Sequence, residues 1–110
     1  MRQRASWLLL RHSSGETDDR LIERARSGDS HAFGELYRRH RAAAESTARW
    51  IMRSRSEVDD VVSEAFAGVL AALNSGHGPR DNFRRYLLAC VRNGCRTRRR
   101  PVITLSLIHI

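Results

Sequence analysis

Residues 57–73 constrain the fold of this chain more than any other stretch. They read EVDDVVSEAFAGVLAAL, and the apolar residues recur at steps of three and four: Val58, Val61, Val62, Ala65, Phe66, Val69, Leu70 and Leu73. This is the period of an amphipathic helix with one buried face. Ser56, with Asp59 three residues later, predicts the start of the helix, and Asn74-Ser75-Gly76 predicts its end. Such a helix needs other elements to cover its apolar face.

Three further segments carry helical patterns, over residues 19–27, 31–52 and 83–98. The short connection at 54–56 makes the second and third helices antiparallel neighbours. We therefore expect an all-α fold, a compact bundle of four helices within one small domain. The expected N-caps of the other helices are, in chain order, Thr17 or Asp18, Asp29 or Ser30, and Asp81 or Asn82.

The last helix has a weaker pattern than the third. Its expected buried residues are Phe83, Tyr86, Leu87, Cys90 and Val91. Gly94 costs about 1 kcal/mol relative to Ala inside a helix, so we expect the C-terminal half to fray.

Charge is distributed unevenly along the chain. Residues 57–73 hold four acidic and no basic residues in a protein of net charge +8: Glu57, Asp59, Asp60 and Glu64. Acids in a first helical turn stabilise the helix dipole, which is one explanation. Glu64 lies beyond that turn, so the alternative is a negative surface for a basic protein partner.

Residues 80–100 are as basic as the preceding helix is acidic. They contain eight arginines against a single acid, Asp81. Arginine pairs bidentately with phosphate and displaces condensed counterions, so this density predicts contact with nucleic acid. We expect some of Arg84, Arg85 and the arginines at 98–100 only to solvate the helix, and the sequence does not distinguish them from those that would contact DNA.

Other features narrow the class of protein. The two cysteines, Cys90 and Cys95, lack a metal or disulfide spacing, and the five histidines form no HxxxH pair. We therefore expect no metal and no cofactor. We also expect no catalysis, because an enzyme such as a nuclease would need paired carboxylates, and adjacent Asp59 and Asp60 diverge on a helix by about 100°. The four-residue apolar run from Trp7 is too short for a signal or membrane segment, so we expect a cytoplasmic protein without membrane contact.

The two ends differ from the centre. Residues 1–16 show no period and are expected to be a disordered leader. The tail 101–110, which contains VITLSLIHI, is uncharged and rich in β-branched residues, so we interpret it as foreign to a helical domain at 17–100.

The order of these signals resembles region 2 of the extracytoplasmic-function (ECF) sigma factors, in the sigma-70 superfamily of bacterial RNA polymerase. The similarity is carried by LIERARSGDSHAFGELYRRH, SEVDDVVSEAF and FRRYLLACVRNGCRTRRR. It implies a truncated ECF-type sigma factor that binds core polymerase and recognises and melts the −10 promoter element to start transcription. Its implied partners are the polymerase β′ clamp helices, promoter DNA with a single-stranded −10 region, and an anti-sigma factor.

The resemblance also implies residue roles. Those matching the polymerase-binding positions are Asp59, Asp60, Ser63, Glu64 and Phe66, where Ser63 replaces the usual Gln and Phe66 packs beneath. Those in the −10 loop and helix, implied to bind DNA, are Arg80, Asn82, Arg84, Tyr86, Arg92, Asn93, Arg96 and Arg99.

Departures from the family pattern leave alternatives open. Tyr86 stands where the family commonly has Trp, and Thr97 replaces a frequent Asp. The family's region 4, which reads the −35 element, has no counterpart after residue 100, so we expect either a fragment or a solitary region 2. A free-standing helical DNA-binding regulator is the alternative function; it explains the basic segment but not the acidic helix.

Overall fold

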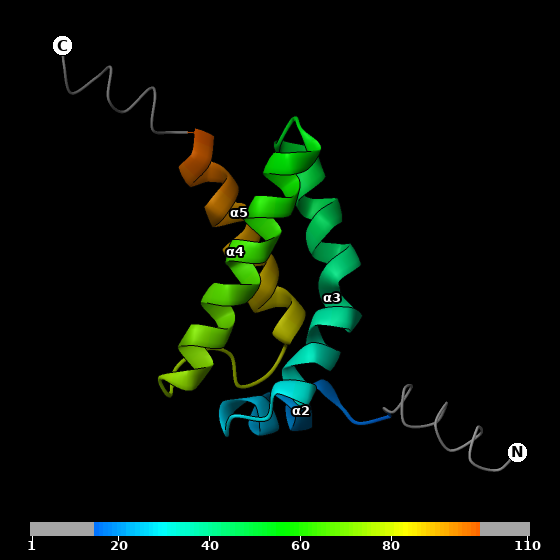
Figure 1. Cartoon of the computed structure of the whole chain (residues 1–110), viewed down its shortest axis with the longest axis vertical. Coiled ribbons are helices and arrows are strands. Elements are labelled where there is room, and N and C mark those ends of the chain that lie inside the picture. Colours follow the sequence, from blue (N-terminus) through cyan, green and yellow to red (C-terminus); the bar gives the residue numbers. More distant parts are fainter. Residues whose placement is uncertain (1–14, 100–110) are drawn as a thin grey trace, which may run out of the picture.

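The computed structural model describes residues 15–99, and they form a bundle of helices (Figure 1). The helices are α2 (Asp18–Arg26), α3 (Ser30–Ile51), α4 (Arg55–Asn74) and α5 (Phe83–Arg99). The prediction of an all-α, four-helix fold is confirmed for this part of the chain. The predictions for the leader and for the tail concern residues that, apart from 15 and 16, lie outside the described range.

The helices pack around one core. Figure 1 shows α3 and α4 running antiparallel from a short connection at one end of the molecule, with α5 beside them and α2 near the opposite end. Each helix contributes fully buried side chains, among them Ile22, Leu36, Val69 and Leu87. The chain therefore buries one continuous apolar interior, as its length predicts.

An aromatic cluster fixes α4 and α5 against α3. The Phe33 ring meets the rings of Phe66 and Phe83 edge to face, at centroid distances of 6.3 and 6.4 Å. Phe66 and Phe83 are themselves 6.4 Å apart, and Phe83 is 0% exposed. Aromatic pairs in such geometry add about 0.5–1.5 kcal/mol each beyond the area they bury.

Of the predicted N-cap alternatives, Thr17 caps α2 and Asp29 caps α3. The cap of α4 is a residue that was not predicted. Helix α4 begins two residues before the predicted start, and Ser54 is its cap. The Ser54 hydroxyl accepts from the Glu57 amide at 3.2 Å, and the Glu57 side chain accepts from the Ser54 amide in return. The prediction of Ser56 as the cap was wrong, because the reciprocal capping box needs Glu or Gln at the third helical position and Ser54 has it.

One prediction about α5 was also wrong, and one buried residue was missed. Tyr86 was predicted to be buried but is 37% exposed, and Cys95, for which no burial was predicted, is 0% exposed. The buried stripe follows steps of four from Phe83 to Cys95, which turns Tyr86 outward. The helix continues past Gly94 to Arg99 without a break. A Cβ atom on Gly94 would lie 3.5 Å from Val61 Cγ1, an ordinary contact distance.

Candidate functional site

Helix α4 presents an acidic surface, formed by Asp59, Asp60, Ser63 and Glu64, all of which are exposed. Phe66 lies beneath it at 4% exposure. Because α4 begins at Arg55, the acid in its first turn is Glu57. Asp59 and Asp60 therefore also lie beyond that turn, and the helix dipole explains them less well than the sequence pattern suggested.

The acids of this surface differ in their partners. Glu64 Oε2 accepts a 2.6 Å hydrogen bond from Arg98 on α5, with the Glu64 side chain 65% exposed. Asp60 forms no ion pair or side-chain hydrogen bond within residues 15–99. Its carboxylate is thus available to form an ion pair with a cationic group of another molecule.

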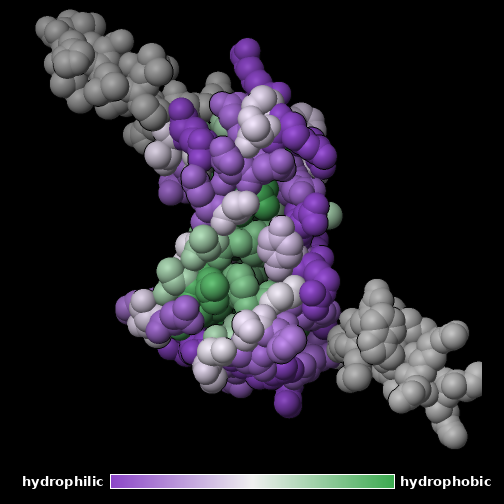
Figure 2. Space-filling model, in the orientation of Figure 1, coloured by the Kyte–Doolittle hydropathy of each residue, from purple (hydrophilic) through white to green (hydrophobic). Residues whose placement is uncertain are grey.

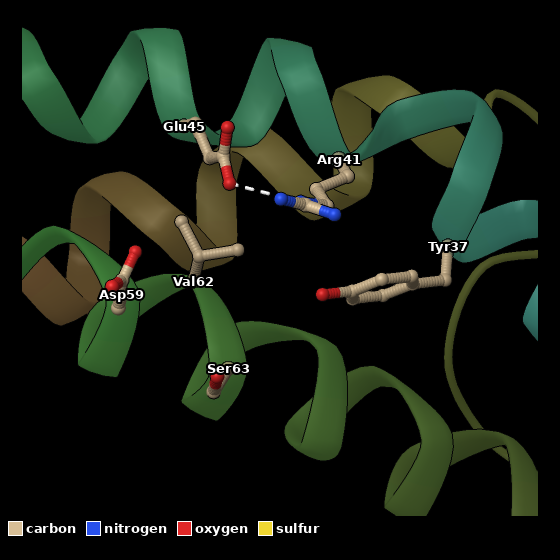
Figure 3. A pocket seen from close by; sticks show the side chains of 6 residues that line it. All are labelled: Tyr37, Arg41, Glu45, Asp59, Val62 and Ser63. Carbon is tan, nitrogen blue, oxygen red and sulfur yellow. Dashed lines mark hydrogen bonds and ion pairs between the residues drawn. The ribbon is translucent and has the colours of Figure 1, made fainter.

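Asp59 and Ser63 extend the surface toward α3, where they line a pocket of about 240 Å³ (Figure 3). The remaining lining residues are Tyr37, Arg41, Glu45 and Val62. Arg41 is paired with Glu45 one turn later on α3, at 2.9 Å, and the Tyr37 hydroxyl points into the opening (Figure 3). Beside the acidic surface, the protein thus has a recess lined mainly by polar side chains.

An apolar surface continues from the acidic one along the same helix. Figure 2 shows it over the C-terminal half of α4, surrounded by polar residues. Ala67 and Ala71 are exposed there and Leu70 is half-buried. One face of α4 therefore offers negative charge near its start and apolar contact near its end.

Helix α5 presents a basic stripe, which we define as Arg85, Arg92 and Arg96. All three are exposed, and steps of seven and four place them on one side of the helix. Tyr86 and Asn93 are exposed beside them. The stripe forms no ion pair within the described residues, so its guanidinium groups are available to phosphate.

Arg84 differs from the stripe because its guanidinium is bonded inward. Its Nε donates to His40 Nδ1 at 3.1 Å, and a second nitrogen donates to the Arg39 carbonyl at 3.3 Å. His40 is 6% exposed, and its Nε2 lies 2.7 Å from the Asp18 carboxylate. The ring therefore donates to Asp18 and accepts from Arg84, an arrangement that only the neutral tautomer satisfies.

The surroundings of His40 agree with that protonation state. Burial lowers the pKa of His40, and the charges of Arg84 and Arg39 lower it further, against the opposing effect of Asp18. The neutral ring thus ties α2 and α5 to α3.

The loop between α4 and α5 is held in place by α2. Arg26 donates to the carbonyls of His77 and Pro79, at 2.5 and 2.7 Å. Gly78 has a φ of +83°, and a Cβ atom there would come within 3.2 Å of Leu73. The conformation therefore requires glycine at this position.

Two DNA-binding candidates lie in this loop. Arg80 is exposed. Asn82 adopts a φ of 45°, which Asn tolerates better than most residues, and its side chain accepts from the Arg85 amide at 3.3 Å. Asn82 is thus the residue that caps α5. The side chain of Arg99 lies outside what the structure describes.

Sequence reasoning missed three residues that hold the site together: Arg26, His40 and Arg98. Arg26 and Arg98 read as ordinary solvated arginines in their own helices, and their partners lie 51 and 34 residues away. Only the position of His40 on the apolar side of its helix could have signalled burial.

Residues 15–99 contain no group of three or more His, Cys, Asp or Glu side chains placed to hold a metal ion. None of their helices has the length and apolar content needed to cross a membrane.

The chain is similar to known proteins over part of its length. The family model described as Sigma-70 region 2 matches residues 36–101. RNA polymerase sigma factor NccH of Alcaligenes xylosoxydans xylosoxydans is 40% identical over 57 residues, which are 52% of this chain and 31% of that protein. The match thus spans less than a third of that relative's length. No solved structure matches the chain.

Proposed function

The chain belongs to the sigma-70 region 2 family, and from that membership we propose that it binds core RNA polymerase and recognises and opens the −10 promoter element. It would act as an ECF-type binding module without catalysis, in the cytoplasm where polymerase works. We further propose residues 17–100 as the functional domain. The observation that carries the proposal is the separation of two charged surfaces: an acidic one on α4, where the described residues leave Asp60 unpaired, and a basic stripe on α5 that forms no ion pair among those residues.

The polymerase contact is assigned to the acidic surface. Asp60 supplies an unpaired carboxylate, and Asp59 and Ser63 border the pocket beside it. The adjoining apolar surface of α4 would extend the contact beyond charge alone. The partner expected is therefore a basic helix surface such as the β′ clamp helices. An anti-sigma factor that covered α4 would block the same contact.

The DNA contact is assigned to α5 and the loop before it. Arg92 and Arg96 would bind phosphates, while Tyr86 and Asn93 lie where they could contact an extruded base. Arg80 would extend this surface into the loop that Arg26 holds in place. Because this loop is already held in one conformation, binding DNA does not have to order it, and the entropic cost of binding is lower.

Capture of the full chain by immobilised core polymerase tests the proposal, with Asp60→Arg as the variant. Asp60 is exposed, and its side chain forms no hydrogen bond or ion pair among the described residues, so the variant should lose capture while its unfolding midpoint stays nearly the same. Glu23→Arg is the matched control, because Glu23 is exposed on α2 and the same charge change there should leave capture intact.

Other outcomes would redirect the assignment. Equal capture of the wild type and the Asp60→Arg variant would remove the polymerase contact from α4. Failure of both to be captured, with DNA binding retained, would favour a free-standing DNA-binding regulator.

A further inference from the structure

Trp50 is the most exposed large apolar side chain in the described range. It is 88% exposed, against 36% for Tyr37 and 37% for Tyr86. It lies in the last turn of α3 and contributes almost nothing to the core. A side chain that would gain several kcal/mol from burial but lies in water is typical of a contact surface.

Three arginines surround Trp50 in the chain: Arg49, Arg53 and Arg55. All are exposed, whereas Ile51 is half-buried and Met52 is buried. The chain reversal between α3 and α4 thus directs its apolar residues inward and its cations outward with Trp50. We call Arg49, Trp50, Arg53 and Arg55 the Trp50 cluster.

The charge of this cluster is not neutralised within the protein. None of its arginines forms an ion pair or side-chain hydrogen bond among residues 15–99. The nearest acid in sequence, Glu57, is occupied by the capping box with Ser54. The cluster therefore combines an exposed indole with three unpaired guanidinium groups.

The cluster lies far from the proposed −10 contact. Figure 1 shows the α3–α4 connection at one end of the bundle and the loop between α4 and α5 at the other. Helix α4 joins the two ends with 20 residues, which span about 30 Å. A ligand at the Trp50 cluster is thus a separate contact, or a second contact with the same long strand.

We propose that the Trp50 cluster binds single-stranded nucleic acid, with a base stacked on Trp50 and phosphates paired with the arginines. Every unpaired base offers a flat face to an indole, and guanidinium groups match phosphate geometry. A duplex satisfies only the charges, because its bases are stacked inside. An acidic protein would also satisfy the charges, but it brings no matching set of flat groups.

The assignment goes beyond the proposed function and can fail independently of it. Polymerase capture depends on Asp60, on the outer face of α4, and the cluster contains no member of the acidic surface. Substitution of Trp50 should therefore leave polymerase capture unchanged, whether or not nucleic-acid binding is lost.

Tryptophan fluorescence tests the stacking directly. The chain has two tryptophans, so Trp7→Phe in the full chain leaves Trp50 as the reporter. We expect a dT12 single strand to quench its emission and a G·C duplex of equal length to quench it far less. Arg53→Ala should weaken binding of dT12 and lower the salt slope of log K by about 0.7. Arg38→Ala, which removes an equal charge from α3 outside the cluster, is the control and should change neither.

A second measurement separates this site from the basic stripe of α5. The anisotropy of labelled dT12 should show Trp50→Ala binding about tenfold more weakly than the wild type, with Trp50→Phe in between. Helical circular dichroism checks that each variant is folded. Absence of quenching by dT12, or equal affinity of the wild type and Trp50→Ala, would overturn the proposal. Equal quenching by hexaglutamate would also overturn it, because charge alone would then explain binding.

Discussion

Helices α4 and α5 are built alike but differ in the charge of their exposed sides. They have 20 and 17 residues, and each buries one stripe against the same core. Their exposed sides carry opposite charge: the acidic surface on α4, and the basic stripe on α5. Within the described residues they are joined by one ion pair, Glu64 with Arg98.

In these two helices, the side chains that hold the fold differ from those that remain available to other molecules. Two helices of opposite charge packed side by side could neutralise each other across their junction. Among the described residues, however, Asp60, Arg92 and Arg96 remain unpaired, because they lie on the exposed sides of their helices. Apolar packing therefore fixes the helices, and their charges stay available for other molecules.

The largest expected effect breaks the packing that both helices share. Phe83→Ala should destabilise the protein by about 3–5 kcal/mol, because the ring is fully buried between α3 and α4. Tyr86→Ala, one turn later on the exposed side, should cost much less. Urea unfolding measures both, and similar losses would contradict the assignment of the two faces of α5.

The next effect should concern DNA and not stability. Arg92→Ala combined with Arg96→Ala should weaken binding to any single strand and lower the salt slope of log K by about 1.4. Unfolding should stay within about 0.5 kcal/mol, because both side chains are exposed. The control pair Arg20→Ala and Arg38→Ala removes equal charge from α2 and α3. An equal loss of single-strand affinity in that control would mean that the stripe contributes only nonspecific charge.

A third prediction uses the different anchoring of the two helices. Helix α4 begins at its own capping box, whereas α5 is also tied to neutral His40 through Arg84. Because burial lowers the pKa of His40 in the folded state, the unfolded chain binds the proton more readily. Stability should therefore fall as the pH drops through about 6.5, the ordinary pKa of histidine.

His40→Gln provides the test of this pH dependence. Its amide can donate to Asp18 and accept from Arg84 without titrating. Thermal midpoints between pH 7.5 and 5 should decline for the wild type and stay nearly level for the variant. Parallel declines would assign the pH dependence to other groups.

The smallest expected effect concerns the ion pair that joins the helices. Glu64 is 65% exposed and Arg98 31%, so the pair should contribute only about 0.2–1 kcal/mol. A double-mutant cycle with Glu64→Gln and Arg98→Gln isolates this coupling from the single effects. A larger coupling energy would mean that charge attraction, and not apolar packing alone, fixes α4 against α5.

Much of this molecule could be predicted from its sequence. The apolar periods predicted four helices, and capping residues placed most of the helix ends within two residues, because these signals are local. The unequal charge of residues 57–73 and 80–100 predicted two surfaces for different partners. The family model over residues 36–101 agrees with the resemblance found in the sequence.

What the sequence could not decide was how side chains distant in the chain meet. Arg26 holds the loop carbonyl of Pro79, Arg84 is bonded inward to His40, and Arg98 pairs with Glu64. Each arginine looks the same in a sequence, since its long side chain can reach solvent or a neighbour. Only the packing of the helices determines whether a partner lies within hydrogen-bonding distance, and so which charges stay available. Local sequence thus determined the helices and their charges, and tertiary structure decided which of those charges face outward unpaired.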